Sequence, residues 1–226
     1  MRVYVGMSDS LWQSLSNPWQ SCLEEAWAAY CAGSLPIGSV VTDPSGQILS
    51  RGRNRIFGCK AEGRDLSGHR LAHAEMNALL ALDHARIDAR SCTLYTTCEP
   101  CPLCVGALRV MRVQAVHYGS RDPVGGSMAL LEATPFMRRA HMAVFGPPSP
   151  MLENMLMALM IDRELTIDSS PRWSLAAWES KTPLGVRLGR TLYETGELRR
   201  RQNDATPVHV VVDSLANRLA STVVEG

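Results

Sequence analysis

The 226-residue sequence lacks the features that mark membrane and secreted proteins. It contains no run of about 18 apolar residues, the length that a membrane-spanning helix needs. The opening segment, Met1 to Ser10, has no basic stretch followed by an apolar run, which is the pattern of a secretory signal. From these absences we expect a cytoplasmic protein with no membrane partner.

An excess of charge of either sign is also lacking. Lys and Arg number 23 against 22 Asp and Glu, which gives a formal net charge of +1. Nucleic-acid binders usually carry a clear positive excess, because neutralising phosphates supplies much of their affinity. The balance argues against a nucleic-acid partner without excluding one.

The cysteines do not form an even set that could pair completely. There are seven, and Cys98, Cys101 and Cys104 crowd into one short segment. An odd number with such a cluster suits reduced thiols at a metal site better than a secreted disulfide framework.

What the chain does have is the composition of a globular protein, with 46% hydrophobic and 20% charged residues. A wholly disordered chain is thereby excluded. The length suits one domain of about 150 residues followed by an extension.

Helical and strand patterns alternate through the first two thirds of the chain. The first helix is expected to start at Asn17–Pro18, with Gln20 closing a capping box, and to end near Cys31 before Gly33. The later expectations are a hairpin (Ile37–Thr42 and Gln47–Arg51), a long loop (Arg53–Gly68), helices (Leu71–Leu82, Cys101–Met111, Gly125–Ala133) and strands (Thr93–Thr97, Val113–Tyr118, Met142–Phe145). This alternation predicts an α/β sheet.

The prolines in Pro147–Pro150 interrupt the alternating pattern. After them, Leu152–Leu165, Trp173–Trp178 and Thr191–Arg201 are predicted helices. We therefore divide the chain into an α/β domain over residues 1–146, to which the motifs below assign the chemistry, and a mainly helical C-terminal extension over residues 151–226.

The segment Pro100-Cys101-Pro102-Leu103-Cys104 places two thiols three residues apart at a predicted helix start. Side chains at that spacing share one helix face, and a helix N-terminus favours the thiolate form that binds metal. Two soft ligands favour zinc. A Cys-x-x-Cys pair alone is also compatible with redox chemistry, so a third ligand is needed.

His73-Ala74-Glu75 supplies a candidate third ligand at the start of another helix. His73 is a potential zinc ligand, although a buried core histidine is the simpler interpretation of that residue by itself. Glu75 lies two positions away and does not share its face, which suits an acid/base role. One His and two Cys leave the fourth zinc position open for water, as in catalytic sites.

His-x-Glu followed by Pro-Cys-x-x-Cys resembles the cytidine and deoxycytidylate deaminase superfamily over roughly Asn17 to Glu132. The similar branch includes guanine deaminases, yeast-type cytosine deaminase and bacterial tRNA adenosine deaminases. The resemblance implies a three-layer α/β/α fold and Zn²⁺ as cofactor. It assigns His73, Cys101 and Cys104 as zinc ligands and Glu75 as the proton shuttle.

Two further residues match positions that contact substrate in this superfamily. Asn54 follows the second predicted strand, where the family has an asparagine that hydrogen-bonds the substrate. Its alternative is an ordinary turn asparagine in a left-handed conformation. Asp122 falls where some relatives have an acidic residue near the substrate, but a turn or capping role is the preferred interpretation.

The segment Tyr95 to Cys104 resembles guanine deaminases more than tRNA deaminases, which tend to have leucine where Cys98 stands. Cys98 itself is expected to point into the core. We therefore expect hydrolytic deamination of a free nucleobase, a nucleoside or a related amino-heterocycle. A tRNA adenosine deaminase is the alternative enzyme, and a noncatalytic zinc module for assembly is the alternative outside catalysis.

Other clusters have plainer explanations than function. Arg138–Arg139 and Arg199–Arg201 could grip phosphates, although basic residues at helix ends are favoured by the helix dipole alone. The Met-rich segment 151–160 is apolar on all sides and should be buried within the domain or between subunits. A homodimer is therefore expected.

Overall fold

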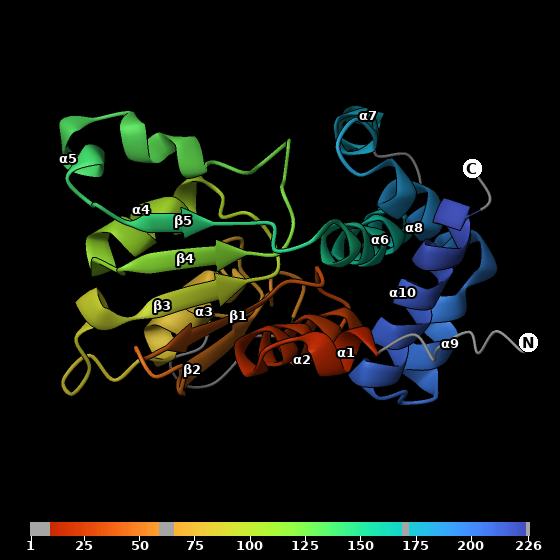
Figure 1. Cartoon of the computed structure of the whole chain (residues 1–226), viewed down its shortest axis with the longest axis horizontal. Helices are drawn as coiled ribbons and strands as arrows, with labels where there is room; N and C mark the ends of the chain where they lie inside the picture. Colours follow the sequence, from red (N-terminus) through yellow and green to blue (C-terminus); the bar gives the residue numbers. More distant parts are fainter. Residues whose placement is uncertain (1–9, 59–65, 169–171, 225–226) are drawn as a thin grey trace, which may run out of the picture.

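The protein is described here by a computed structural model covering residues 10–58, 66–168 and 172–224. Its strands form one mixed sheet in the order β2-β1-β3-β4-β5 (Figure 1). The strands are β1 (Gly38–Thr42), β2 (Ile48–Arg53), β3 (Thr93–Thr96), β4 (Ala115–Tyr118) and β5 (Ala143–Phe145). Strand β1 is antiparallel to β2 and β3, whereas β3, β4 and β5 are parallel.

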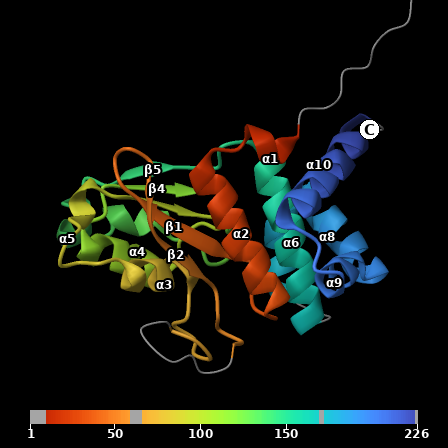
Figure 2. The ribbon, with the colours of Figure 1, turned by 90° about the horizontal axis from the view of Figure 1, so that it is seen from below.

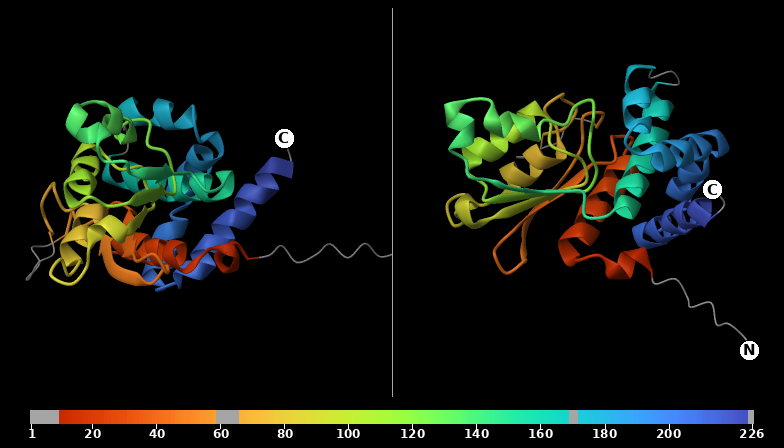
Figure 3. Two further views of the ribbon diagram at one scale, coloured as in Figure 1. Left: turned by 60° about the vertical axis from the view of Figure 1, so that its left-hand side comes forward. Right: turned by 45° about the horizontal axis from the view of Figure 1, so that its top comes forward.

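Helices cover both faces of this sheet, which confirms the predicted three-layer architecture (Figure 3). Helix α2 (Asn17–Cys31) lies on one face, and helices α3 (Ala74–Ala81) and α4 (Pro102–Met111) lie on the other. The remaining helices are α1 (Leu11–Ser14), η1 (Ala89–Ser91), η2 (Met128–Glu132), α5 (Pro135–Arg138), α6 (Pro150–Ile167), α7 (Arg172–Glu179), α8 (Pro183–Thr195), α9 (Glu197–Asn203) and α10 (Val208–Val224).

Strand β1 shows why both faces must be covered. All five of its residues are buried. Successive side chains of a strand point to opposite faces, and accordingly Val40 joins the core beneath α2 whereas Val41 joins the core beneath α3 and α4. A strand that is apolar on both sides belongs in the middle of a sandwich of helices.

Gly52 in β2 allows α3 to approach the sheet closely. A Cβ atom on Gly52 would collide with the backbone of Ala74 and Ala78 in α3. The Ser50 hydroxyl, two strand positions away on the same face, donates a hydrogen bond of 2.7 Å to the Ala78 carbonyl. These contacts fix α3, and with it the two chemistry-bearing residues at its start, against the central strands.

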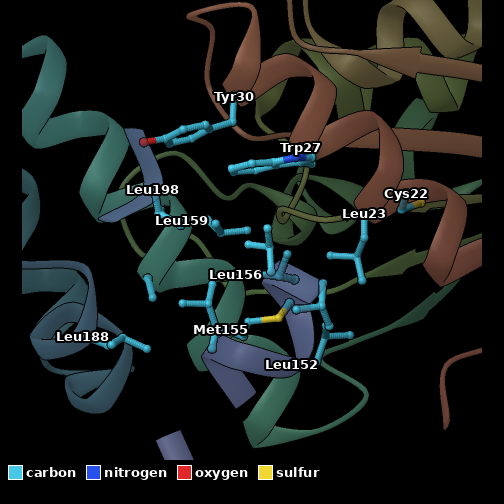
Figure 4. Packing of buried hydrophobic residues seen from close by; sticks show 14 of the residues in the cluster. Cys22, Leu23, Trp27, Tyr30, Leu152, Met155, Leu156, Leu159, Leu188 and Leu198 are labelled. Carbon is cyan, nitrogen blue, oxygen red and sulfur yellow. The ribbon is translucent and has the colours of Figure 1, made fainter. Parts of the chain in front are cut away.

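The C-terminal helices continue the core that begins at α2 (Figure 2). Trp27 and Tyr30 of α2 stack nearly parallel, with ring centroids 5.1 Å apart, and face α6 (Figure 4). The Tyr30 hydroxyl donates a 2.5 Å hydrogen bond to Asp162, and the Arg163 guanidinium lies 4.2 Å from the centre of the Tyr30 ring. The core residues that α6 and its neighbours contribute are Leu152, Met155, Leu156, Ala158, Leu159, Leu188, Leu192, Leu198, Val211, Val212, Leu215 and Leu219.

The Met-rich helix α6 is therefore buried within the chain, so its apolar sequence does not require a second subunit. The homodimer stays a prediction, as does the division into residues 1–146 and 151–226. Within the described ranges, no helix has the length and hydropathy to cross a membrane.

Several sequence-based boundaries were wrong for local reasons. The predicted helix over Thr191–Arg201 is two helices, because Gly196 adopts a left-handed conformation with φ of 65° between them. Only Met128–Glu132 of the predicted Gly125–Ala133 helix is helical, as a 3₁₀ turn. At α2 the N-cap is Ser16 rather than Asn17, and the Gln20 side chain donates to the Trp12 carbonyl instead of closing a capping box. Residues 59–65 of the predicted long loop lie outside the described residues.

Candidate metal centre and active site

Two helix N-termini bring the predicted zinc ligands together. His73 is the N-cap of α3, Cys101 is the N-cap of α4, and Cys104 lies in the first turn of α4. The His73 Nδ1 atom is 3.5 Å from the Sγ atom of each cysteine, and the two Sγ atoms are 3.7 Å apart. Cys101 and Cys104 lie 28 and 31 positions after His73 in the chain, and the three side chains thus form one compact donor set.

These separations fit a tetrahedral zinc ion. Zn–S bonds of about 2.3 Å and Zn–N bonds of about 2.0 Å at tetrahedral angles place two sulfurs about 3.8 Å apart, and sulfur and nitrogen about 3.5 Å apart. The observed spacings are 3.7 Å and 3.5 Å. Two sulfur donors and one imidazole are also a donor set that zinc favours. The residues present therefore fit the ion that the sequence predicts.

The electrostatics of the site favour a thiolate. A hydrogen bond from the Cys104 thiol is the largest cause that lowers the pKa of Cys101, to about 4, and contact with His73 lowers it further. The same pairing with Cys101 raises the pKa of His73. The N-terminal ends of α3 and α4 both point to this cluster, and their partial positive charge also stabilises a thiolate.

Glu75 lies beside the donor set but outside it. Its side chain is buried, and its Oε2 atom is 3.3 Å from the Cys104 Sγ atom. The Thr96 hydroxyl at the end of β3 donates a 3.0 Å hydrogen bond to the Glu75 Oε1 atom. Burial raises the pKa of Glu75. A buried carboxyl group held at one oxygen has its other oxygen directed toward the metal site.

Asn54 is buried at the end of β2 and its amide is oriented by neighbours. Its Oδ1 atom accepts hydrogen bonds from the Ser34 hydroxyl at 2.7 Å and from the Ile56 N–H at 3.2 Å. The Arg55 N–H donates to the Ala72 carbonyl, so the residue after Asn54 pairs with the residue before His73. The left-handed turn alternative is wrong, since Asn54 is not among the described non-glycine residues with positive φ.

A pocket of about 90 Å³ adjoins the segment that carries the cysteine ligands. Thr97, Cys98 and Asp122 line it together with Glu164 of α6 and Trp178 of α7. The Trp178 Nε1 atom donates a 3.3 Å hydrogen bond to the Asp122 Oδ1 atom. The C-terminal helices therefore contribute a wall to a pocket next to the metal site.

Asp122 and Cys98 both line the pocket, and Asp122 also stabilises a turn. The Asp122 Oδ1 atom accepts hydrogen bonds from the Val124 and Gly125 N–H groups, which is the turn role that the sequence favoured. The Cys98 side chain lines the pocket and is not one of the three clustered donors, and its burial raises the pKa of its thiol.

Sequence reasoning missed the residues that hold the site in place. Thr96 and Ser34 fix the Glu75 and Asn54 side chains from elements 21 and 20 residues away. The Glu99 N–H donates to the Ser120 carbonyl and its carboxylate accepts from the Asp122 N–H, which joins the loop before Cys101 to the loop after β4. No local motif signals these residues, because each acts through a tertiary contact.

Comparison with known proteins agrees with this geometry. Residues 13–120 match the cytidine and deoxycytidylate deaminase zinc-binding region. The tRNA-specific adenosine deaminase of Bacillus subtilis is 35% identical over 130 residues, covering 54% of this chain and 74% of the relative. The enzyme of the same name from Agrobacterium fabrum is 32% identical over 106 residues, covering 47% of this chain and 65% of the relative.

Among solved structures, a mutant of the protein NE0047 in complex with 8-azaguanine aligns with a TM-score of 0.53, covering 73% of this chain and 97% of that chain. At 21% identity this likeness concerns the fold alone. With the His73, Cys101 and Cys104 donor set, the fold and the matched region define a zinc-dependent deaminase. The chain belongs to the cytidine and deoxycytidylate deaminase zinc-binding family.

Proposed function

We propose that this zinc-dependent deaminase acts on adenosine held in tRNA. The observation that carries this choice is the 35% and 32% identity to two tRNA-specific adenosine deaminases, over 130 and 106 residues. The sequence alone placed a free base first, on the grounds of net charge and of Cys98. Identity spread over more than 100 residues outweighs one neighbouring residue and a whole-chain charge sum.

The chain's own residues divide the chemistry among them. A zinc ion bound by His73, Cys101 and Cys104 would supply Lewis-acid activation of water at neutral pH. Glu75 accepts one proton of the attacking water at Oε2 and passes it to the ring nitrogen, and it then takes the second proton of that water and passes it to the amino group, which leaves as ammonia. Thr96 holds Oε1, so the working oxygen is fixed in direction. The buried position of Glu75 limits competition from bulk water.

Asn54 is proposed to position the ring. Ser34 and Ile56 occupy its Oδ1 atom, which leaves the Nδ2 amide as the end that can donate to a ring acceptor. Adenine offers such acceptors at its ring nitrogens. The amide orientation is set before substrate arrives, and this preorganisation lowers the entropy cost of alignment.

Replacing Asn54 with Ala is expected to raise KM and lower kcat together. One lost hydrogen bond costs about 1–3 kcal/mol, so kcat/KM should fall by roughly 10- to 100-fold while zinc stays bound. Steady-state kinetics with zinc analysis of the same preparation provides the measurement. A kcat/KM value within about twofold of wild type would remove Asn54 from the substrate site.

A free base or nucleoside is the second candidate substrate, and the pocket beside the site favours it. Helices α6 and α7 form one wall of this pocket through Glu164 and Trp178, in a region beyond the matched residues 13–120. Concave, largely apolar pockets with a few polar groups are typical of small-molecule sites. A continuous RNA strand would have to pass this wall.

A direct comparison of substrates tests the proposal. We expect the purified protein to form inosine in a tRNA transcript with a kcat/KM at least about tenfold above that for adenosine, because extended contacts add binding energy that a nucleoside lacks. Ammonia release would be followed in parallel for adenine, guanine and cytosine. Faster turnover of a free base than of tRNA would establish the second candidate instead.

A further inference from the structure

A cavity of about 320 Å³ at one end of the molecule is lined by four arginines and a histidine. We call it the basic groove and define it by Arg90, Arg109, Arg112, Arg139 and His141. These residues come from three separate segments: η1, the C-terminal end of α4, and the connection between α5 and β5. All four arginines lie at the C-terminal end of a helix or 3₁₀ turn, where the helix dipole favours them, but the dipole does not explain why these ends converge on one cavity.

The basic groove lies at the edge of the sheet opposite the zinc ligands. Arg90, Gln114 and His141 precede β3, β4 and β5, so the groove is at the starting edge of the parallel strands. Cys101 follows β3 and therefore lies at the finishing edge. Helix α4 joins the two, with its N-terminus at the zinc ligands and its C-terminus at the groove (Figure 1). Its 10 residues span about 15 Å.

Two arginines of the groove are held in place through one side of the guanidinium. The Arg109 Nε atom donates to the Phe136 carbonyl at 2.9 Å, and its guanidinium lies 4.1 Å from the centre of the Phe136 ring. The Arg139 Nε atom donates to the Pro135 carbonyl at 3.1 Å. Because these bonds use only the Nε atoms, the terminal nitrogens remain able to bind an anion.

Carboxylates neutralise little of this charge. Across residues 10–58, 66–168 and 172–224, Asp88 is the carboxylate that forms an ion pair with a groove arginine, at 2.9 Å from Arg90. Arg109, Arg112 and Arg139 form no ion pair with a described carboxylate. A net charge of +1 for the whole chain thus conceals a local concentration of positive charge.

The other arginine cluster in the sequence is used internally. The Arg199 guanidinium lies over the Tyr193 ring, Arg200 donates to the Thr195 carbonyl, and Arg201 pairs with Glu197 at 2.9 Å. The contacts of Arg199 and Arg200 tie α9 to α8, and the Arg201–Glu197 pair lies within α9. The cluster at Arg138–Arg139, in contrast, adjoins a cavity that further cations line.

We propose that the basic groove binds phosphates of a structured RNA whose target base reaches the zinc site. This inference rests on the proposed tRNA substrate. Guanidinium groups match phosphate oxygens in shape and charge, and backbone contacts of this kind position a nucleic acid without reading its sequence. A groove about one α4 length from the site lies within the reach of an RNA stem adjoining the target loop.

The test compares charge removal inside and outside the groove. Arg112→Gln/Arg139→Gln removes two groove charges, and Arg187→Gln/Arg190→Gln removes two exposed charges from α8. Binding of fluorescently labelled tRNA is measured for the zinc-loaded proteins over a range of salt concentrations. We expect the groove variant to bind tRNA about tenfold more weakly than wild type. The slope of its log K plotted against log salt concentration should be smaller in magnitude by about 1 to 2, while the affinity and slope of the α8 variant stay near those of wild type.

Equal tRNA affinity in the two double variants would refute the proposal that the basic groove binds RNA. So would full displacement of tRNA by inorganic phosphate but not by chloride of matched ionic strength, because that result marks a small-anion site. Deamination of adenosine as nucleoside is assayed in the same preparations. Nucleoside turnover should be unchanged in the groove variant, and a fall in it would show damage to the site.

Failure of the groove and failure of the proposed function give different results. If wild type deaminates tRNA but both double variants bind tRNA equally, RNA binding by the basic groove is refuted and the proposed tRNA deaminase function is retained. If wild type binds tRNA through the basic groove without forming inosine, the proposed tRNA deaminase function is refuted and RNA binding by the groove is retained.

Discussion

Glu75→Gln is expected to abolish nearly all turnover while leaving the zinc content and the fold unchanged. Glutamine keeps the size of the side chain and can still accept the hydrogen bond from Thr96. It cannot take up the proton that Glu75 Oε2 is proposed to carry. A positioned acid/base contributes about 10²- to 10⁴-fold to a rate. Because one residue serves several proton transfers here, kcat should fall by at least about 10³-fold.

The matched control is Glu24→Gln, which alters an exposed carboxylate paired with Arg51 away from the site. Its kcat should equal that of wild type. Both variants are measured for steady-state rate, zinc per chain and circular dichroism. If Glu75→Gln kept more than about a tenth of wild-type kcat, another group would have to move the proton. If it lost zinc, Glu75 would be a ligand, contrary to its place outside the donor set.

Cys101→Ala is expected to lose zinc, activity and stability together. Removal of one of three protein ligands leaves His73 and Cys104, which is too few for a tight zinc site. Zinc binding stabilises only the folded chain, by about 4 kcal/mol when free zinc exceeds Kd about a thousandfold. The variant should therefore melt well below wild type, and turnover should fall below detection.

Cys31→Ala provides the control, because it removes a half-buried thiol that lies outside the donor set. It should retain about one zinc per chain. Zinc is measured by elemental analysis, and melting is followed with and without a chelator. The chelator should lower the melting temperature of wild type and Cys31→Ala but not that of Cys101→Ala. Full zinc occupancy in Cys101→Ala would refute its assignment as a ligand.

The zinc ligands could be predicted from sequence because their pattern is local. Cys101 and Cys104 share one helix turn, and His73 and Glu75 lie at one helix start. That α3 and α4 start side by side followed from the family resemblance. The three-layer fold was predictable from the alternation of helical and strand patterns along the chain and from the family resemblance.

Residues that act through tertiary contacts could not be predicted in this way. Thr96 reads as one more strand threonine until the register of β3 places it against Glu75. Ser34 belongs to a turn whose partner, Asn54, lies beyond two strands. The net charge likewise did not indicate the basic groove, because a sum over the whole chain does not record where in the fold the charged residues lie.

The C-terminal region was the least predictable part of the chain. Helix α10 was not predicted. The break at Gly196 was also not predicted, because a glycine within a helical pattern is compatible both with a continuous helix and with a helix end. The contact of Trp178 with Asp122 depends on how α7 packs, which no local pattern specifies.

The central claim is that the chain replaces an exocyclic amino group with oxygen from water. Zinc-loaded protein is incubated in ¹⁸O-labelled water with tRNA, adenosine and the free bases, and the products are analysed by mass spectrometry alongside ammonia release. The account predicts at least one product that carries a single labelled oxygen in place of the amino group, formed in equal amount with ammonia and absent with Glu75→Gln. Ammonia release without labelled oxygen in the product, or no product from any of these substrates, would contradict it.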